Sequence, residues 1–312
     1  VTGELHIYAQ RHIVAEVGDD PNEISLEEAR KIDPRYEVDD IVETEVTPRN
    51  FGRIAAQNAK QVVVQRIREA ERGMVFEKFS SRENDIVTGI IQRMENKNVY
   101  IDLGKAEAIL TPNEQIPGEI YQYHDRMKTY IVEVKKTSKG PQIMVSRTHP
   151  GLLKRLFELE VPEIHDGLVE IKSVAREPGM RSKISVYTKD ENIDPVGACV
   201  GHKGMRVQTI VNELRGEKID IVKYSSEPDQ YVANALSPAK VVSTEVLEEE
   251  KICRVIVPDY QLSLAIGKEG QNARLAAKLT GWKIDIKSES QAAEEAEQGA
   301  QEVGVAYEAD ED

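Results

Sequence analysis

The stretches Gly201-His202-Lys203-Gly204 and Gly267-Lys268-Glu269-Gly270 are the most informative part of this 312-residue sequence. Each leads into a run of apolar residues at helical spacing, then a glycine, and then the same tetrapeptide, Lys-Ile-Asp-Ile, at 218–221 and 283–286. The two loops are 66 residues apart, and the interval from loop to tetrapeptide differs by one residue. A single Gly-x-x-Gly is a weak signal, but two in matched surroundings indicate an internal duplication.

Both loops have the features needed to hold a sugar-phosphate backbone. Glycines carry no side chain, so the backbone can approach a nucleic acid closely. The helix that follows presents unpaired N–H groups and the positive end of its dipole to phosphates. A lysine between the glycines adds charge. This arrangement is typical of a KH domain, in which the loop clamps about four nucleotides.

Two observations limit this interpretation. Each loop could instead be a tight turn between helices, and Glu269, an acidic residue between the second pair of glycines, should weaken phosphate binding there. A mononucleotide P-loop is excluded, because the sequence has no Gly-x-x-x-x-Gly-Lys-Ser/Thr pattern. The duplication nevertheless favours two RNA-binding units. Strands are expected before the helix pair of each unit, as in the type II KH order, and they cover 167–174, 182–187, 240–246 and 253–257.

A run of short strands precedes these units. Turn residues separate five candidate strands, at 86–94, 98–103, 107–110, 129–135 and 142–146. Five short strands in some 65 residues predict a small closed barrel of the OB type, which binds single strands by stacking bases on aromatic side chains beside basic groups. The aromatic and basic candidates, any of which could instead pack in the barrel, are Tyr100, Tyr121, Tyr123, His124, Tyr130, Lys105, Arg126 and Lys128.

The first 80 residues form a separate mixed block. Two alternating runs, at 4–9 and 11–17, are predicted to pair as strands, and a third strand is predicted at 40–46. Ser25, with Glu28 three residues later, predicts a capped helix start. Apolar residues from Phe51 to Ala70 recur at steps of three and four and predict a long amphipathic helix over 51–72. Its basic face is either a solvated surface or a docking surface for a large partner.

Charge and cysteine content narrow the possible classes of protein. The formal net charge is −14, but residues 288–312 contain nine acidic residues and no Lys or Arg. The rest of the chain is close to balanced, and its local basic clusters could bind phosphates. The two cysteines, Cys199 and Cys253, are far apart, which excludes a disulfide framework and a cysteine-based zinc site. The sequence has neither a membrane-length apolar run nor a basic-then-apolar leader at its start.

Four stretches are similar to the NusA family of bacterial transcription elongation and termination factors. They are FGRIAAQ (51–57), GPQIMVSRTHPG (140–151), NELRGEKIDI (212–221) and IVPDYQLSLAIG (256–267). The resemblance runs from residue 1 to about 288. Family members usually begin with more helical sequence before the first strand, so the chain is expected to be shortened at its N-terminus.

The resemblance and the patterns together predict a multidomain α+β protein. The expected parts are a partial N-terminal α/β domain that binds RNA polymerase (1–80), a five-stranded OB-type barrel (81–148), a first KH domain (149–226), a second KH domain (227–288) and an acidic disordered tail (289–312). The KH domains are expected to be of type II.

The family resemblance implies a cytoplasmic, non-enzymatic adaptor. Its implied partners are RNA polymerase, nascent single-stranded RNA and other antitermination factors, with no membrane and no cofactor. It would promote pausing and hairpin-dependent termination, and support antitermination in other complexes. One alternative is a KH/OB component of an RNA-processing enzyme assembly, but six scattered histidines offer no nucleophile–base arrangement and no metal-ligand cluster is visible. A ribosome-associated KH protein is a further alternative, although strongly basic extensions are lacking.

The predicted RNA-binding residues come from both loops and from the barrel, and no catalytic or metal-binding residue is predicted. They are Gly201, His202, Lys203, Gly204 and Arg206 of the first unit, Gly267, Lys268, Glu269, Gly270, Asn272 and Arg274 of the second, and Tyr100, Lys105, His124 and Arg147 in or next to the barrel.

Overall fold

The computed structural model describes residues 6–18, 20–46 and 51–295. The chain divides into two compact units, Val1–Gly73 and Met74–Asp312, and the division falls within one helix, α2 (Phe51–Ser80). Among the described residues, no helix is both long and apolar enough to cross a membrane.

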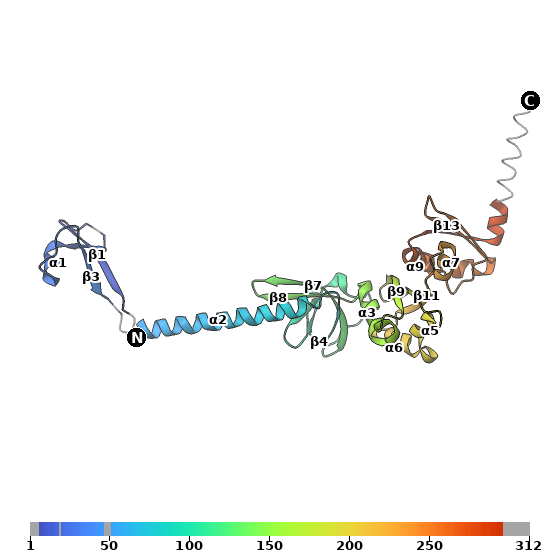
Figure 1. Cartoon of the computed structure of the whole chain (residues 1–312), viewed down its shortest axis with the longest axis horizontal. Coiled ribbons are helices and arrows are strands. Elements are labelled where there is room, and N and C mark those ends of the chain that lie inside the picture. Colours follow the sequence, from blue (N-terminus) through green and yellow to red (C-terminus); the bar gives the residue numbers. More distant parts are fainter. Residues whose placement is uncertain (1–5, 19, 47–50, 296–312) are drawn as a thin grey trace, which may run out of the picture. The chain divides into compact units, whose positions relative to one another are not determined.

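The first unit contains a small sheet in the order β2-β1-β3 (Figure 1). Its elements are β1 (Tyr8–Val14), β2 (Glu23–Ser25), α1 (Leu26–Ile32) and β3 (Ile41–Glu45). The two strands predicted at 4–9 and 11–17 are wrong as a pair, because β1 runs through both and is antiparallel to β3 instead. The cap of α1 is confirmed, since the Ser25 hydroxyl accepts a hydrogen bond from the Glu28 N–H.

Helix α2 begins where predicted but continues eight residues further, to Ser80. Its apolar stripe is not a buried face in this structure, because Ile54, Val62, Val63 and Ile67 are all about half exposed. The C-terminal turns behave differently: Phe79 is buried in the barrel core, with Val75 and Phe76 packed against it. Periodicity therefore predicted the helix, whereas the exposure of its apolar stripe is seen only in the structure.

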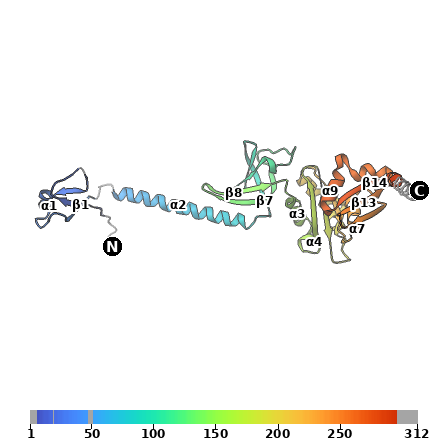
Figure 2. The same cartoon turned by 90° about the horizontal axis from the view of Figure 1, so that it is seen from above.

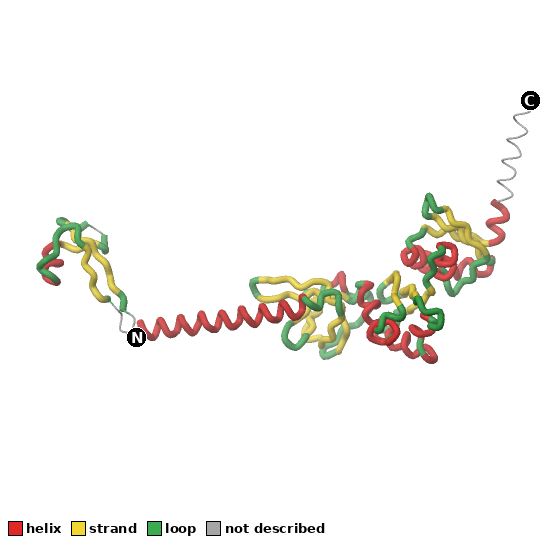
Figure 3. Tube along the Cα trace, viewed as in Figure 1, coloured by secondary structure: helices red, strands yellow, loops and turns green. Residues whose placement is uncertain are grey.

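The barrel prediction is confirmed. Five strands close into a barrel in the order β4-β5-β6-β8-β7 (Figure 3). The buried side chains of its core include Ile91, Ile101, Leu110, Ile131 and Ile143. The strands are β4 (Ile86–Glu95), β5 (Asn98–Asp102), β6 (Glu107–Leu110), β7 (Arg126–Thr137) and β8 (Gly140–Ser146), with a short 3₁₀ turn η1 (Pro112–Glu114) between β6 and β7.

Two similar α/β domains follow, and each has a three-stranded sheet whose central strand is parallel to one neighbour and antiparallel to the other. The first comprises α3 (Pro150–Glu160), α4 (Pro162–His165), β9 (Glu170–Glu177), β10 (Arg181–Tyr187), α5 (Pro195–Val200), η2 (His202–Gly204), α6 (Met205–Glu213) and β11 (Lys218–Lys223). The second comprises α7 (Pro228–Ala235), β12 (Ser243–Leu247), β13 (Ile252–Val257), η3 (Asp259–Gln261), α8 (Leu262–Ile266), η4 (Lys268–Gly270), α9 (Gln271–Thr280) and β14 (Lys283–Ser288). Helices α4 and α7 were not predicted.

The second domain packs against the sheet of the first. Helix α9 contacts β9 and β10, and Figure 2 shows α9 beside those strands. Ala175 and Val222 of the first domain belong to the same hydrophobic cluster as Val232, Leu275 and Leu279 of the second. Residues 289–295 after β14 are helical, so the start of the predicted disordered tail is ordered, and the rest of that prediction lies outside the described residues.

Candidate nucleic-acid interface

The first Gly-x-x-Gly loop is a sharp left-handed turn between two helices. Helix α5 starts at Pro195, where the Asp194 carboxylate accepts a hydrogen bond from the Val196 N–H, and it ends at Gly201 with φ 73°. Lys203 (φ 51°) and Gly204 (φ 76°) continue in the left-handed region before α6 begins. Glycine adopts this conformation without the steric cost that a Cβ imposes, which explains the two glycines.

The second loop repeats this backbone almost angle for angle. Gly267 has φ 77°, Glu269 has φ 53° and Gly270 has φ 73°, compared with 73°, 51° and 76° at the corresponding positions of the first loop. Two loops of different sequence therefore hold the same shape, which supports the duplication inferred from the sequence.

The helix after each loop starts without a side-chain cap. Gly204 and Gly270 are the N-cap residues of α6 and α9, and neither helix start has a side-chain hydrogen bond. The first N–H groups of such a helix need partners from outside the helix and suit an anion. The exposed Lys203 and Lys268 add positive charge beside these helix starts, a combination that suits a phosphate group.

A groove lies beside each loop at corresponding positions of the repeat. The first groove, about 500 Å³, is lined by Glu160, Glu163, Gly197, Ala198, Gly201, His202, Met205, Arg206 and Thr209. The second groove, about 440 Å³, is lined by Met180, Arg181, Lys218, Pro238, Ser263, Leu264, Gly267, Lys268, Gln271 and Asn272. Six positions are common to both grooves at the 66-residue offset, from Gly197 with Ser263 to Arg206 with Asn272.

Most of the predicted loop residues are accessible. His202, Lys203, Lys268, Glu269 and Arg274 are exposed, and the four glycines and Arg206 are partly exposed. The two arginines are already engaged within the protein. Arg206 donates to the Glu163 carboxylate at 2.9 Å and to the Ala198 carbonyl at 2.6 Å, and Arg274 donates to Glu177 at 2.6 Å.

Asn272 is placed differently from the prediction. Its side chain is 5% exposed, and its amide donates to the Leu236 and Ala265 carbonyls, both at 3.0 Å. Those bonds join α9 to α8 and to the end of α7. Asn272 is therefore a buried structural residue rather than an exposed RNA contact.

The barrel candidates are scattered. Lys105 and His124 are exposed, whereas Tyr100 is partly covered by Arg93, whose guanidinium lies 3.8 Å from the ring centre. Tyr130 is buried and stacks on His149 at 4.5 Å. The Tyr121 hydroxyl donates to Glu119, and burial together with that carboxylate raises the pKa of Tyr121. Tyr123, which is 56% exposed, is the most accessible of the four candidate tyrosines.

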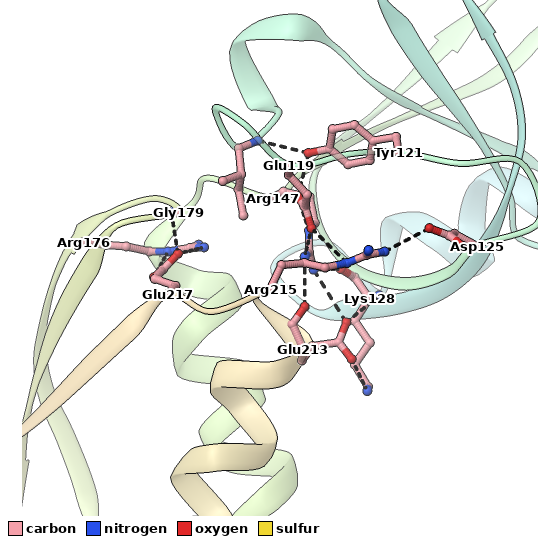
Figure 4. Close-up of polar contacts among 11 residues, drawn as sticks. Glu119, Tyr121, Asp125, Lys128, Arg147, Arg176, Gly179, Glu213, Arg215 and Glu217 are labelled. Atoms are coloured by element: carbon pink, nitrogen blue, oxygen red, sulfur yellow. Dashed lines mark hydrogen bonds and ion pairs between the residues drawn. The ribbon is translucent and has the colours of Figure 1, made fainter.

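Arg147, which was predicted to contact RNA, is engaged within the protein. Its side chain is 1% exposed and lies where the barrel meets the first α/β domain (Figure 4). It pairs with Glu119, donates to the Lys128 carbonyl at 2.9 Å and donates to the Glu213 carbonyl at 3.0 Å. Glu119 and Lys128 belong to the barrel and Glu213 belongs to the first α/β domain, so Arg147 is an interdomain contact.

Further polar contacts at this seam were missed by sequence reasoning. Lys128 pairs with the Glu213 carboxylate at 2.9 Å, and Arg215 pairs with Asp125 at 3.0 Å (Figure 4). Nothing in the periodicity marks these residues, because each pair joins positions 85 or more apart in the sequence. Glu213 and Arg215 occur in NELRGEKIDI, one of the four stretches that carry the resemblance, and this was the available signal for their side of the seam.

A second buried pair lies just inside the first α/β domain. The Arg176 guanidinium binds both carboxylate oxygens of Glu217, at 2.8 and 2.9 Å, and neither side chain is exposed (Figure 4). Glu217 also accepts from Ser182 and from the Gly179 N–H. Burial alone would raise the pKa of Glu217, but the bonds from Arg176, Ser182 and Gly179 outweigh it and hold that pKa below the usual range.

Comparison with known families assigns all four folded parts. The family models that match are the NusA N-terminal domain (residues 1–73), the S1 RNA binding domain (80–146), the NusA-like first KH domain (147–224) and the NusA-like second KH domain (228–294). The two α/β domains are therefore KH domains, and the barrel is an S1 domain.

Curated relatives match over most of the chain. The transcription termination/antitermination protein NusA of Bacillus subtilis is 68% identical over 293 residues, which cover 94% of this chain and 79% of that protein. NusA of Halalkalibacterium halodurans is also 68% identical, over 94% of this chain and 76% of its own length. NusA of Thermus thermophilus is 45% identical, over 91% of this chain and 73% of its own length.

Proposed function

The chain belongs to the NusA family of transcription termination/antitermination proteins, and from this premise we propose that it is an adaptor that holds RNA polymerase and nascent single-stranded RNA together. The N-terminal domain would dock on polymerase. The S1 and KH domains would hold the RNA, promoting pausing and hairpin-dependent termination, and antitermination in other complexes. The adaptor would act in the cytoplasm, where its partners are.

One observation carries the RNA part of the proposal. Two loops of different sequence adopt the same left-handed backbone, each ahead of a helix whose start has no side-chain cap. A tight turn that served only to reverse the chain would not need an exposed lysine and an open helix start in both copies. Two weak clamps on one chain also reinforce each other, since binding at one raises the effective RNA concentration at the other.

The glycines provide a sharp test. A Cβ at Gly204 or Gly270 would meet no atom within 4 Å, whereas one at Gly201 would lie 2.6 Å from the Arg206 side chain. Replacing both Gly204 and Gly270 with Asp therefore adds negative charge at the clamps without a clash against a neighbouring residue, and the only strain it adds is that of a Cβ at positive φ. The matched control replaces Gly216 and Gly281 with Asp, since both have positive φ and open space but lie outside the loops.

The measurement is fluorescence anisotropy of a labelled unstructured RNA across a salt series. We expect the wild type and the Gly216/Gly281 control to bind with the same salt dependence, with a log–log slope of about −0.7 for each phosphate neutralised. The Gly204→Asp/Gly270→Asp variant should lose at least tenfold in affinity. Equal affinity of this variant and the control, with both folded by circular dichroism, would remove the clamp assignment.

The polymerase part needs its own test. The wild type and the Gly204→Asp/Gly270→Asp variant should bind purified bacterial core polymerase equally in analytical size exclusion, because the clamps lie outside residues 1–73. Only the wild type should lengthen a hairpin-stabilised pause in transcription by that polymerase. Lack of polymerase binding by both proteins would contradict docking by this chain.

A further inference from the structure

The two grooves share one wall and differ in the other. The common wall comes from the loop and its two helices, at the six corresponding positions. The opposite wall of the first groove comes from its own domain and carries Glu160 and Glu163. In the second groove that wall is built largely by the neighbouring first KH domain, through Met180, Arg181 and Lys218. The residues that the two grooves do not share therefore differ in charge: Glu160 and Glu163, the latter paired with Arg206, line the first, whereas Arg181 and Lys218 line the second.

Of the two cations on that wall, Arg181 is already used. Its guanidinium binds both carboxylate oxygens of Asp220, at 2.8 and 2.9 Å, within the first KH domain. Lys218 is the first residue of β11 and is exposed, and its ammonium group has no ion pair with the described residues. Lys268, on the loop side of the same groove, is likewise exposed and unpaired among the described residues.

We propose that Lys218 of the first KH domain binds a phosphate of the RNA held by the second loop, so that the neighbouring domain completes the second clamp. This inference rests on the proposed RNA-binding function. It gives the second clamp two cations, Lys218 and Lys268, which line one groove from two different domains. The extra cation offsets Glu269, whose carboxylate lies in the same loop. The first loop has Lys203 at that position and faces a glutamate wall.

The chain contains a matched control. Lys283 is the first residue of β14, as Lys218 is of β11, and both begin the tetrapeptide Lys-Ile-Asp-Ile. Lys283 is equally exposed but lines neither groove. The variants Lys218→Ala and Lys283→Ala change net charge by the same amount at corresponding sites, so a general electrostatic effect would affect them alike.

The experiment uses the full chain and the same labelled single-stranded RNA. Lys218→Ala should weaken binding several-fold and reduce the magnitude of the salt slope by about 0.7, the value for one phosphate contact on a single strand. Lys283→Ala should match the wild type. If the two variants bind alike, the Lys218 assignment is wrong while the clamp proposal stands. If the wild type itself does not bind RNA, the proposed function fails first.

A double-mutant cycle tests whether Lys218 acts at the second clamp and not elsewhere. Residues that contact one segment of ligand are energetically coupled, whereas distant ones add independently. Lys218→Ala should therefore reduce RNA affinity by a different factor in a Lys268→Ala background than in the wild type. In a Lys203→Ala background it should reduce RNA affinity by the same factor as in the wild type. Additive effects in both backgrounds would overturn the placement at the second groove.

Discussion

In the first KH domain, the Lys183–Asp220 ion pair lies against the second domain, where the fully buried Lys183 ammonium also donates to the Ser237 carbonyl. Arg254 and Asp285 occupy the corresponding positions of the second domain, opposite each other on the parallel strand pair, and both are about half exposed. Asp220 and Asp285 belong to identical tetrapeptides. The aspartate of the same tetrapeptide thus forms an ion pair beside the neighbouring domain in one copy and lies on the surface in the other.

The difference follows from what each copy has as a neighbour. The first KH domain lies between the S1 barrel and the second KH domain and has buried ionic contacts on both sides. In the described part of the chain, the corresponding sheet face of the second domain is covered by no further domain and is lined by Ser243, Arg254, Asp285 and Lys287. Buried ion pairs are costly to break and exposed ones contribute little, so the two copies should respond unequally to equivalent mutations.

The largest contrast should come from Arg176→Ala in the first domain. It leaves Glu217 charged and buried, which costs about 3–5 kcal/mol in free energy of unfolding. Arg254→Ala in the second domain removes an exposed pair with Glu245 and should cost less than about 1 kcal/mol. Urea unfolding followed by circular dichroism measures both.

Trp282, the single tryptophan, sharpens that measurement because it packs on the core of the second domain. If its fluorescence transition stays in place while the circular dichroism transition of Arg176→Ala moves to lower urea, the domains unfold separately. Superimposable curves for Arg176→Ala and Arg254→Ala would contradict the unequal response.

A smaller effect is expected at Arg206 and Asn272, which occupy the same position of the repeat. Asn272→Ala leaves the buried Leu236 and Ala265 carbonyls without a donor and should cost about 1–3 kcal/mol. Arg206→Ala removes a pair with Glu163 in which both side chains are 31% exposed, and it should cost about 0–1 kcal/mol. Thermal unfolding of the two variants side by side checks this, and an equal shift in Tm would show that burial does not separate them.

The smallest effect should come from exchanging charge at the third loop position. Glu269→Lys should strengthen RNA binding severalfold and Lys203→Glu should weaken it, with little change in stability because both side chains are exposed. Anisotropy in low and high salt measures both variants, and the differences should shrink as salt screens the charges. A tighter-binding Lys203→Glu variant would argue against phosphate contact at this position.

Local sequence was sufficient for the loops, the barrel strands and the helix caps. The two glycines and the residue before the second one adopt the left-handed turn for reasons of backbone sterics, and alternating apolar residues predicted the five barrel strands. These features depend on residues within a few positions of each other, so a single sequence displays them. The KH interpretation and the family resemblance rested on such features.

Burial and the identity of neighbours were decided only by the tertiary structure. Arg147 and Asn272 were predicted as RNA contacts from residue type, yet both are buried, because partners far away in the sequence fold over them. The same applies to the exposed stripe of α2 and to Lys218, which lines a groove of the next domain. Backbone conformation is a short-range property of the chain, whereas the surroundings of a side chain come from contacts that only the folded protein creates.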